Sequence, residues 1–138
     1  MTLSLAEANS IVAAAITKAR QLNVRVGVAV CDKLGNVIAL NRMDGAYANA
    51  SRYSVGKAVV SAGTGLPSGD VVGIVDHSPV AVVVAQGVPA IRIRGGFPVL
   101  RGGEVEGGCG VAGALSPEQD EECARAGIAI LERQHAGR

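Results

Sequence analysis

The segment that most constrains the fold covers residues 28–46 and reads VAVCDKLGNVIALNRMDGA. Apolar residues alternate with small or polar ones from Val24 to Val30, and a second apolar run begins at Val37. Between the two runs, Asp, Gly and Asn supply the residue types that tight turns require. The pattern predicts a β-hairpin whose second strand ends in a polar Arg-Met-Asp-Gly sequence. Strands joined in this way are antiparallel.

A second strand pair is predicted near the other end of the chain. Residues 97–100 lead into an Arg-Gly-Gly-Glu turn, and a glycine-rich run covers residues 105–114. Glycine weakens an ordinary strand, so this run indicates a bulge or the close approach of another backbone. Residues 79–85 are predicted to form a further strand, and Ile91 and Ile93 to lie at a strand edge.

Three helices are predicted around these strands. Ser4 and Glu7 have the spacing of a capping box and begin a helix over about residues 5–22. A second helix begins at residue 49 or 51 and reaches about residue 62, where Gly63 and Gly65 stop it. A Ser-Pro-Glu-Gln sequence with an acidic first turn begins the last helix, which covers about residues 116–134. Hairpins and helices together favour an α+β sandwich.

The amino-acid composition agrees with one domain over residues 1–138. The chain is 49% hydrophobic but contains only three aromatic residues, so Val, Ile, Leu and Ala must fill its core. Such a core is thin for a monomer. A nearly neutral surface with a formal net charge of +1 makes subunit contact an effective way to bury more apolar area. We therefore expect a homo-oligomer.

Charge and hydropathy exclude several partners. The chain has 13 Lys and Arg against 12 Asp and Glu, without a basic run, which argues against nucleic-acid binding. Its first helix follows directly on Met-Thr and lacks the pattern of a signal peptide. The longest apolar stretch, residues 79–91, is too short to span a bilayer. No membrane association is predicted, and the expected location is cytoplasmic.

Three cysteines are present, in an odd count and without a CxxC pair, so no disulfide framework is predicted. Buried, inert thiols are one interpretation of Cys31, Cys109 and Cys123. A reactive thiol would need a nearby base and a depressed pKa. Cys109, which lies within the glycine-rich run, is the first candidate for such a role.

Polar residues cluster where the first hairpin leads into the second helix. Arg42 and Asp44 lie at the strand exit, while Ser51, Ser54 and Lys57 follow at three-residue intervals and can share one helix face. Two hydroxyls and an ammonium group suit an anionic ligand such as a carboxylate. The alternative is structural: Arg42 and Asp44 pair with each other or cap the helix, and Lys57 is an ion-pair partner.

These motifs resemble the family of small haem-binding, GlcG/HbpS-like proteins, also found as the C-terminal domain of PduO-type proteins. The resemblance covers about residues 3–131. It implies a profilin-like or PAS-like antiparallel sheet of about five strands flanked by helices, and assembly into dimers or larger rings. Its most specific parts are residues 42–46, Lys57, residues 95–98, residues 110–113 and residues 119–120.

The resemblance makes haem a possible cofactor, and a haem iron needs an axial ligand. His77 is the candidate imidazole, with a solvated loop histidine as the alternative. Met43 and Cys31 are possible soft ligands, although packing explains both. No nucleotide cofactor is indicated, because the glycine-rich run lacks the lysine of a P-loop and does not complete a dinucleotide fingerprint.

Two functions remain open at this point. The first is a protein that binds haem or a small anionic ligand through Arg42, Met43, Asp44, Ser51, Ser54, Lys57 and Cys109. The second is a small cofactor-independent enzyme of the isomerase, lyase or hydrolase type, acting on a carboxylated or enolisable metabolite. In that case Lys57 or Arg42 would stabilise an oxyanion, and His77, Asp44 or Cys109 would move protons.

Overall fold

The computed structural model describes residues 2–71 and 91–136, and the side chains up to residue 134. In this part of the chain, helices and strands follow one another in the order that the hairpin and helix patterns predict. They are α1 (Leu5–Gln21), β1 (Gly27–Asp32), β2 (Val37–Arg42), α2 (Ala50–Thr64), the short 3₁₀ helix η1 (Ser68–Asp70), β3 (Gly96–Arg101), β4 (Glu104–Ala112) and α3 (Pro117–Ala136).

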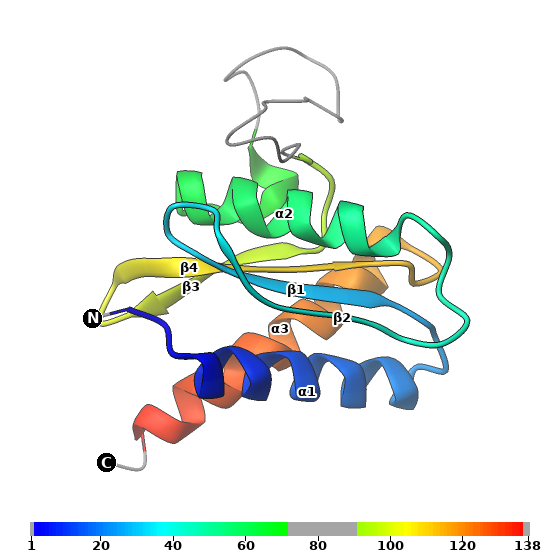
Figure 1. Ribbon diagram of the computed structural model, residues 1–138, viewed down its shortest axis with the longest axis horizontal. Coiled ribbons are helices and arrows are strands. Elements are labelled where there is room, and N and C mark those ends of the chain that lie inside the picture. Colours follow the sequence, from blue (N-terminus) through cyan, green and yellow to red (C-terminus); the bar gives the residue numbers. More distant parts are fainter. Residues whose placement is uncertain (1, 72–90, 137–138) are drawn as a thin grey trace.

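The four strands form one antiparallel sheet in the order β2-β1-β4-β3. Helix α2 covers one face of this sheet, and α1 and α3 cover the other (Figure 1). The predicted α+β architecture is therefore confirmed. In the register, Gly27 of the inner strand β1 lies opposite Arg42 on β2 and Ala112 on β4.

The strand count differs from the sequence-based prediction. The described residues form four strands rather than about five. Ile91 and Ile93 lie outside any strand, because their backbone groups bond to other elements: the N–H of Ile91 donates to the carbonyl of Gly56, and the Ser68 hydroxyl donates to the carbonyl of Ile93. The strand predicted over residues 79–85 lies outside the described residues.

The predicted helix ends are close to the observed ones, with one exception. Ser4 and Glu7 form the predicted capping box at the start of α1. Gly63 does not stop α2, which continues to Thr64. The helix ends at Gly65, whose φ of 72° is left-handed and whose N–H donates to the carbonyl of Ser61. No helix in the described ranges is both long and apolar enough to cross a membrane.

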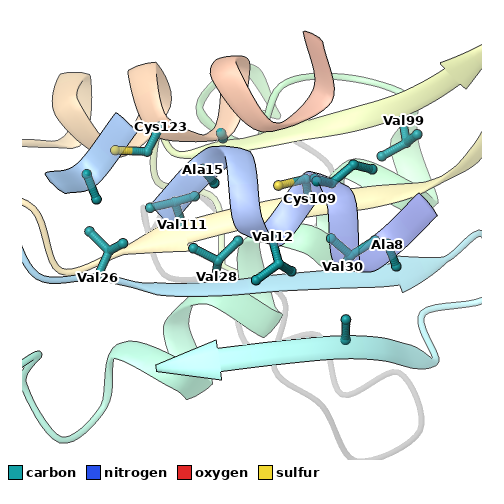
Figure 2. Packing of buried hydrophobic residues seen from close by; sticks show 14 of the residues in the cluster. Ala8, Val12, Ala15, Val26, Val28, Val30, Val99, Cys109, Val111 and Cys123 are labelled. Carbon is teal, nitrogen blue, oxygen red and sulfur yellow. The ribbon is translucent and has the colours of Figure 1, made fainter. Parts of the chain in front are cut away.

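The main core lies between the sheet and the pair α1 and α3 (Figure 2). It is built almost entirely from small side chains, as the composition requires. Val28, Val30 and Val111 point from the sheet toward Val12 and Ala15 of α1. A second, smaller cluster joins the sheet to α2; its members are Ala29, Cys31, Val55, Ala58, Val59 and Ala62.

Glycines in β4 allow α2 to lie directly on the strand. A Cβ atom on Gly110 would lie 2.0 Å from the carbonyl oxygen of Ser54, and one on Gly108 would lie 2.1 Å from that of Ala58. Neither position can carry a side chain while α2 keeps its place. The close backbone approach that the glycine-rich run predicts is therefore confirmed at these two positions.

Glu7 should make the stability of this fold depend on acid. Its carboxylate accepts hydrogen bonds from Arg101 and from the Ser4 N–H, and these contacts lower the pKa of Glu7 from 4.5 to about 2. A pKa depressed in the folded state adds stability that is present above pH 4.5 and is lost as the pH falls toward 2. We expect the melting temperature of Glu7→Gln to fall less over this range than that of the wild type. Glu132→Gln, at an exposed position of α3, is the control, and an unchanged acid response in Glu7→Gln would contradict the assignment.

Candidate functional site

Most of the candidate residues meet at one end of the sheet. Arg42 lies opposite Gly27, and a Cβ atom on Gly27 would lie 3.1 Å from the backbone nitrogen of Ser51. The exit of β2 therefore adjoins the first turn of α2. The start of α2 and the turn from β4 into α3 lie at this same end of the sheet, on the right in Figure 1.

Lys57 belongs to α2 and is buried between this helix and the sheet, close to the same end. Its side chain is only 3% exposed, and its Nζ donates to the carbonyl of Val111 at 2.9 Å and to Oδ2 of Asp120 at 3.2 Å. Burial lowers the pKa of Lys57 and raises that of Asp120, because removal from water disfavours both charges more than their attraction restores them. Of the two interpretations of Lys57, the structure therefore shows the structural one, an ion pair with Asp120.

Asp120 is the partner that sequence reasoning missed. The acidic residues at 118–121 predict only that Asp120 stabilises the start of the last helix. Its Oδ1 does accept the Ala114 N–H at 2.9 Å. Its other oxygen holds Lys57. Gly95 leaves the space for this contact, since a Cβ atom there would lie 2.7 Å from the ammonium nitrogen. The pair therefore ties α2 to β4 and to the start of α3.

Arg42 and Asp44 are both exposed and do not pair with each other. Neither has an ion-pair partner among the described side chains. Asp44 does not cap α2 either: the N-cap residue is Asn49, which makes no side-chain capping bond, and the first turn has no acidic residue. The Arg42 guanidinium and the positive end of the α2 dipole are thus both open to an anion.

The other candidates, just after β2 and on α2, are more enclosed. Ser51 is half-buried, and its carbonyl accepts the hydroxyl of buried Ser54 at 2.7 Å. Met43 is buried, and its sulfur accepts the Val26 N–H at 3.4 Å. On the helix face shared by Ser51, Ser54 and Lys57, the first residue is therefore half-buried and the other two are buried against the sheet.

Cys109 lies on the opposite face of the sheet from α2. Its side chain points into the core beneath α1 and α3 (Figure 2). Burial raises the pKa of Cys109 and of Cys31 to about 12, and that of Cys123 to about 11, so all three thiols are protonated at neutral pH. The structure does not bring Cys109 together with Arg42 or Lys57.

The predicted sulfur ligands do not fit a haem-iron site. The Met43 sulfur is buried and already accepts a backbone hydrogen bond, and the cysteine sulfurs are buried thiols. In the described part of the chain, no three His, Cys, Asp or Glu side chains gather to hold a free metal ion. His77, the predicted axial ligand, lies outside the described residues.

Comparisons with known proteins support the resemblance seen in the sequence. A double mutant of Streptomyces reticuli HbpS is 32% identical, with a TM-score of 0.80, over 95% of this chain and 88% of its own. The Klebsiella pneumoniae protein ORFY is 28% identical, with a TM-score of 0.83, over 96% and 92% of the two chains. The PduOC–haem complex is 26% identical, with a TM-score of 0.80, over 94% of each chain. The family model described as haem degrading protein HbpS-like matches residues 3–129, nearly the whole sequence, and the chain therefore belongs to this HbpS-like family.

Proposed function

We propose that this protein binds haem or another small anionic ligand at the end of the sheet where β2 leads into α2. The observation that carries the proposal is the exposed Arg42 guanidinium, which has no ion-pair partner among the described side chains and adjoins the first turn of a helix without acidic residues. A guanidinium group binds carboxylates through two parallel hydrogen bonds. A helix N-terminus adds partial positive charge and free N–H groups.

Family membership adds haem to the candidate ligands. One structural relative, PduOC, is a complex with haem. In the present chain, Arg42 could hold the propionates of haem, while Met43 and Cys31, the predicted soft ligands of its iron, are buried. His77 stays the proposed histidine for that role. Haem is thus proposed as a ligand because it carries carboxylates, a group that a smaller anionic ligand can also carry.

In this proposal, Lys57 and Ser54 support the ligand site from within the fold. Their side chains lie between α2 and the sheet, and the Lys57–Asp120 pair fixes α2 against β4 and α3. This contact holds the first turn of α2 next to Arg42. Met43 acts in the same way from the position after β2, where its sulfur accepts the Val26 N–H.

Replacing Arg42 with Ala should weaken ligand binding without changing stability. Loss of a charge-assisted, two-bond contact costs about 1.5 to 3 kcal/mol, or roughly ten- to hundredfold in the dissociation constant. Titrations with haem and with iron-free protoporphyrin IX, which carries the same two propionates, would measure it. We expect the same loss for both porphyrins, because Arg42 acts on the carboxylates.

Lys33→Ala is the matched control for this experiment. Lys33 is also an exposed cation, but it lies in the turn between β1 and β2, at the other end of the hairpin from Arg42. It should keep the wild-type affinity. Equal losses in the two variants would indicate general attraction to a cationic surface, and wild-type affinity in Arg42→Ala would remove this end of the sheet from the proposal.

Self-association stays a prediction, and the edge strand β2 supports it. Leu34, Val37 and Leu40 are exposed large apolar residues in β2 and the turn before it. β2 lies at the edge of the sheet that the described residues form, so one row of its backbone groups has no partner strand there. A second subunit that covered this edge would bury apolar surface that the thin core leaves exposed.

A further inference from the structure

Two of the three aromatic residues in this chain lie together at the candidate site. The chain has two tyrosines, one phenylalanine and no tryptophan. Tyr47 lies in the connection from β2 to α2, and Tyr53 lies in the first turn of α2. Their ring centroids are 6.0 Å apart at an interplanar angle of 74°, an edge-to-face contact.

Backbone contacts locate this tyrosine pair. The carbonyl of Tyr47 accepts the Ala50 N–H at 3.1 Å, and Ala50 adjoins Gly27, the residue opposite Arg42. Burial, the Tyr53 ring and the negative charge of Asp120 all raise the pKa of Tyr47. The tyrosine pair therefore lies at the start of α2, at the end of the sheet where the chain leaves β2 after Arg42.

The fold does not need either ring for its core. Tyr47 is 45% exposed and Tyr53 is 39% exposed, and neither belongs to the buried clusters that join the sheet to its helices. Exposed aromatic rings are typical of binding surfaces, where they bury a large area with little loss of side-chain freedom. In a chain with so few aromatic residues, two such rings beside the exposed Arg42 indicate a ligand contact.

We propose that Tyr47 and Tyr53 form an aromatic wall of the ligand site and select a flat, unsaturated ring that carries a carboxylate. The ring lies against the tyrosines, and the carboxylate binds Arg42. Porphyrins with propionate side chains and simple aromatic acids both belong to this class. The inference rests on the proposed function, which requires only the anionic group, and adds the flat ring.

Two probes of equal charge and similar size test the inference: 2-naphthoate, whose rings are flat, and decahydro-2-naphthoate, its saturated counterpart. An aromatic contact contributes about 0.5 to 1.5 kcal/mol beyond buried area. Calorimetry should therefore show that the wild type binds 2-naphthoate about two- to tenfold more tightly. In Tyr47→Leu/Tyr53→Leu this preference should disappear while the saturated acid binds as before. Arg42→Ala should weaken both acids equally.

Proton NMR on the unmodified protein provides a second readout that does not depend on the variants folding. With only two tyrosines, their ring resonances are easily assigned, and 2-naphthoate should shift both. Phe97 is the internal control, because its ring lies below the Arg125 guanidinium at 5.0 Å and packs on the core between the sheet and α3. Its resonances should not move.

The outcomes separate the two proposals. Equal binding of the two acids, with loss of both in Arg42→Ala, would overturn the aromatic wall and leave the proposed function intact. Unshifted tyrosine resonances on saturation with 2-naphthoate, or an unchanged preference in the double variant, would also overturn it. If the wild type binds neither acid and no porphyrin, both proposals fail together.

Discussion

Replacing Lys57 with Met should lower the free energy of unfolding by about 3 to 5 kcal/mol, because it leaves the Asp120 carboxylate buried without its partner. Met keeps the length and most of the apolar stem of Lys, so the loss reports the ammonium group rather than packing. The carbonyl of Val111 loses its side-chain donor in the same variant. Urea denaturation at neutral pH, with circular dichroism as the signal, would measure the change.

The double variant Lys57→Met/Asp120→Asn is the control for this result. Asparagine can still accept the Ala114 N–H, and both buried charges are gone. Most of the lost stability should return, since neutral replacements of a buried pair are often tolerated. Near-wild-type stability of the single variant would contradict the buried pair and indicate that Lys57 contacts water in solution.

Gly110→Ala should be at least as damaging, at about 3 kcal/mol or more, because the added methyl group meets backbone rather than a movable side chain. It would lie 2.0 Å from the carbonyl oxygen of Ser54 and 2.6 Å from the nitrogen of Ala58. Relief requires α2 to move away from β4, which would separate Lys57 from Val111 and Asp120. The same denaturation experiment would measure this loss.

Gly63→Ala is the matched control, because it makes the same change in a place with room. Gly63 lies in α2 and is exposed, and a methyl group added there would meet no atom of the described residues within 4 Å, the backbone of α2 itself apart. Alanine there should stabilise the protein by about 0.5 to 1 kcal/mol, since glycine is a poor helix residue. Similar effects of the two substitutions would contradict direct contact between α2 and β4.

Local patterns predicted the parts of this fold that local interactions determine. The Asp-Lys-Leu-Gly-Asn turn forms as its residue types suggest, with Asp32 Oδ1 accepting the N–H groups of Leu34 and Asn36. The capping box at Ser4 and the start at Ser116 behave in the same way. Each of these signals involves residues that lie close together in the sequence, so a linear pattern contains all the information that is needed.

Pairings between distant residues could not be predicted in this way. Lys57 and Asp120 are 63 positions apart, and only the packing of α2, β4 and α3 brings them together. The position of Cys109 could have been predicted from the sequence more easily. The strand period of two places it on the face opposite its neighbours Gly108 and Gly110, so identifying which face those glycines present to a helix would have located its thiol.

The direct packing of α2 on the glycines of β4 also affects which substitutions this protein can accept. Backbone atoms have no rotamers, so a helix that rests on them has one depth and one offset along the strand, whatever side chains it carries elsewhere. Residues on its outer surface, including the exposed ones of its first turn, can therefore be exchanged without displacing it. A lineage of such proteins could acquire new ligand preferences by substituting the rim of the site while inheriting the same support.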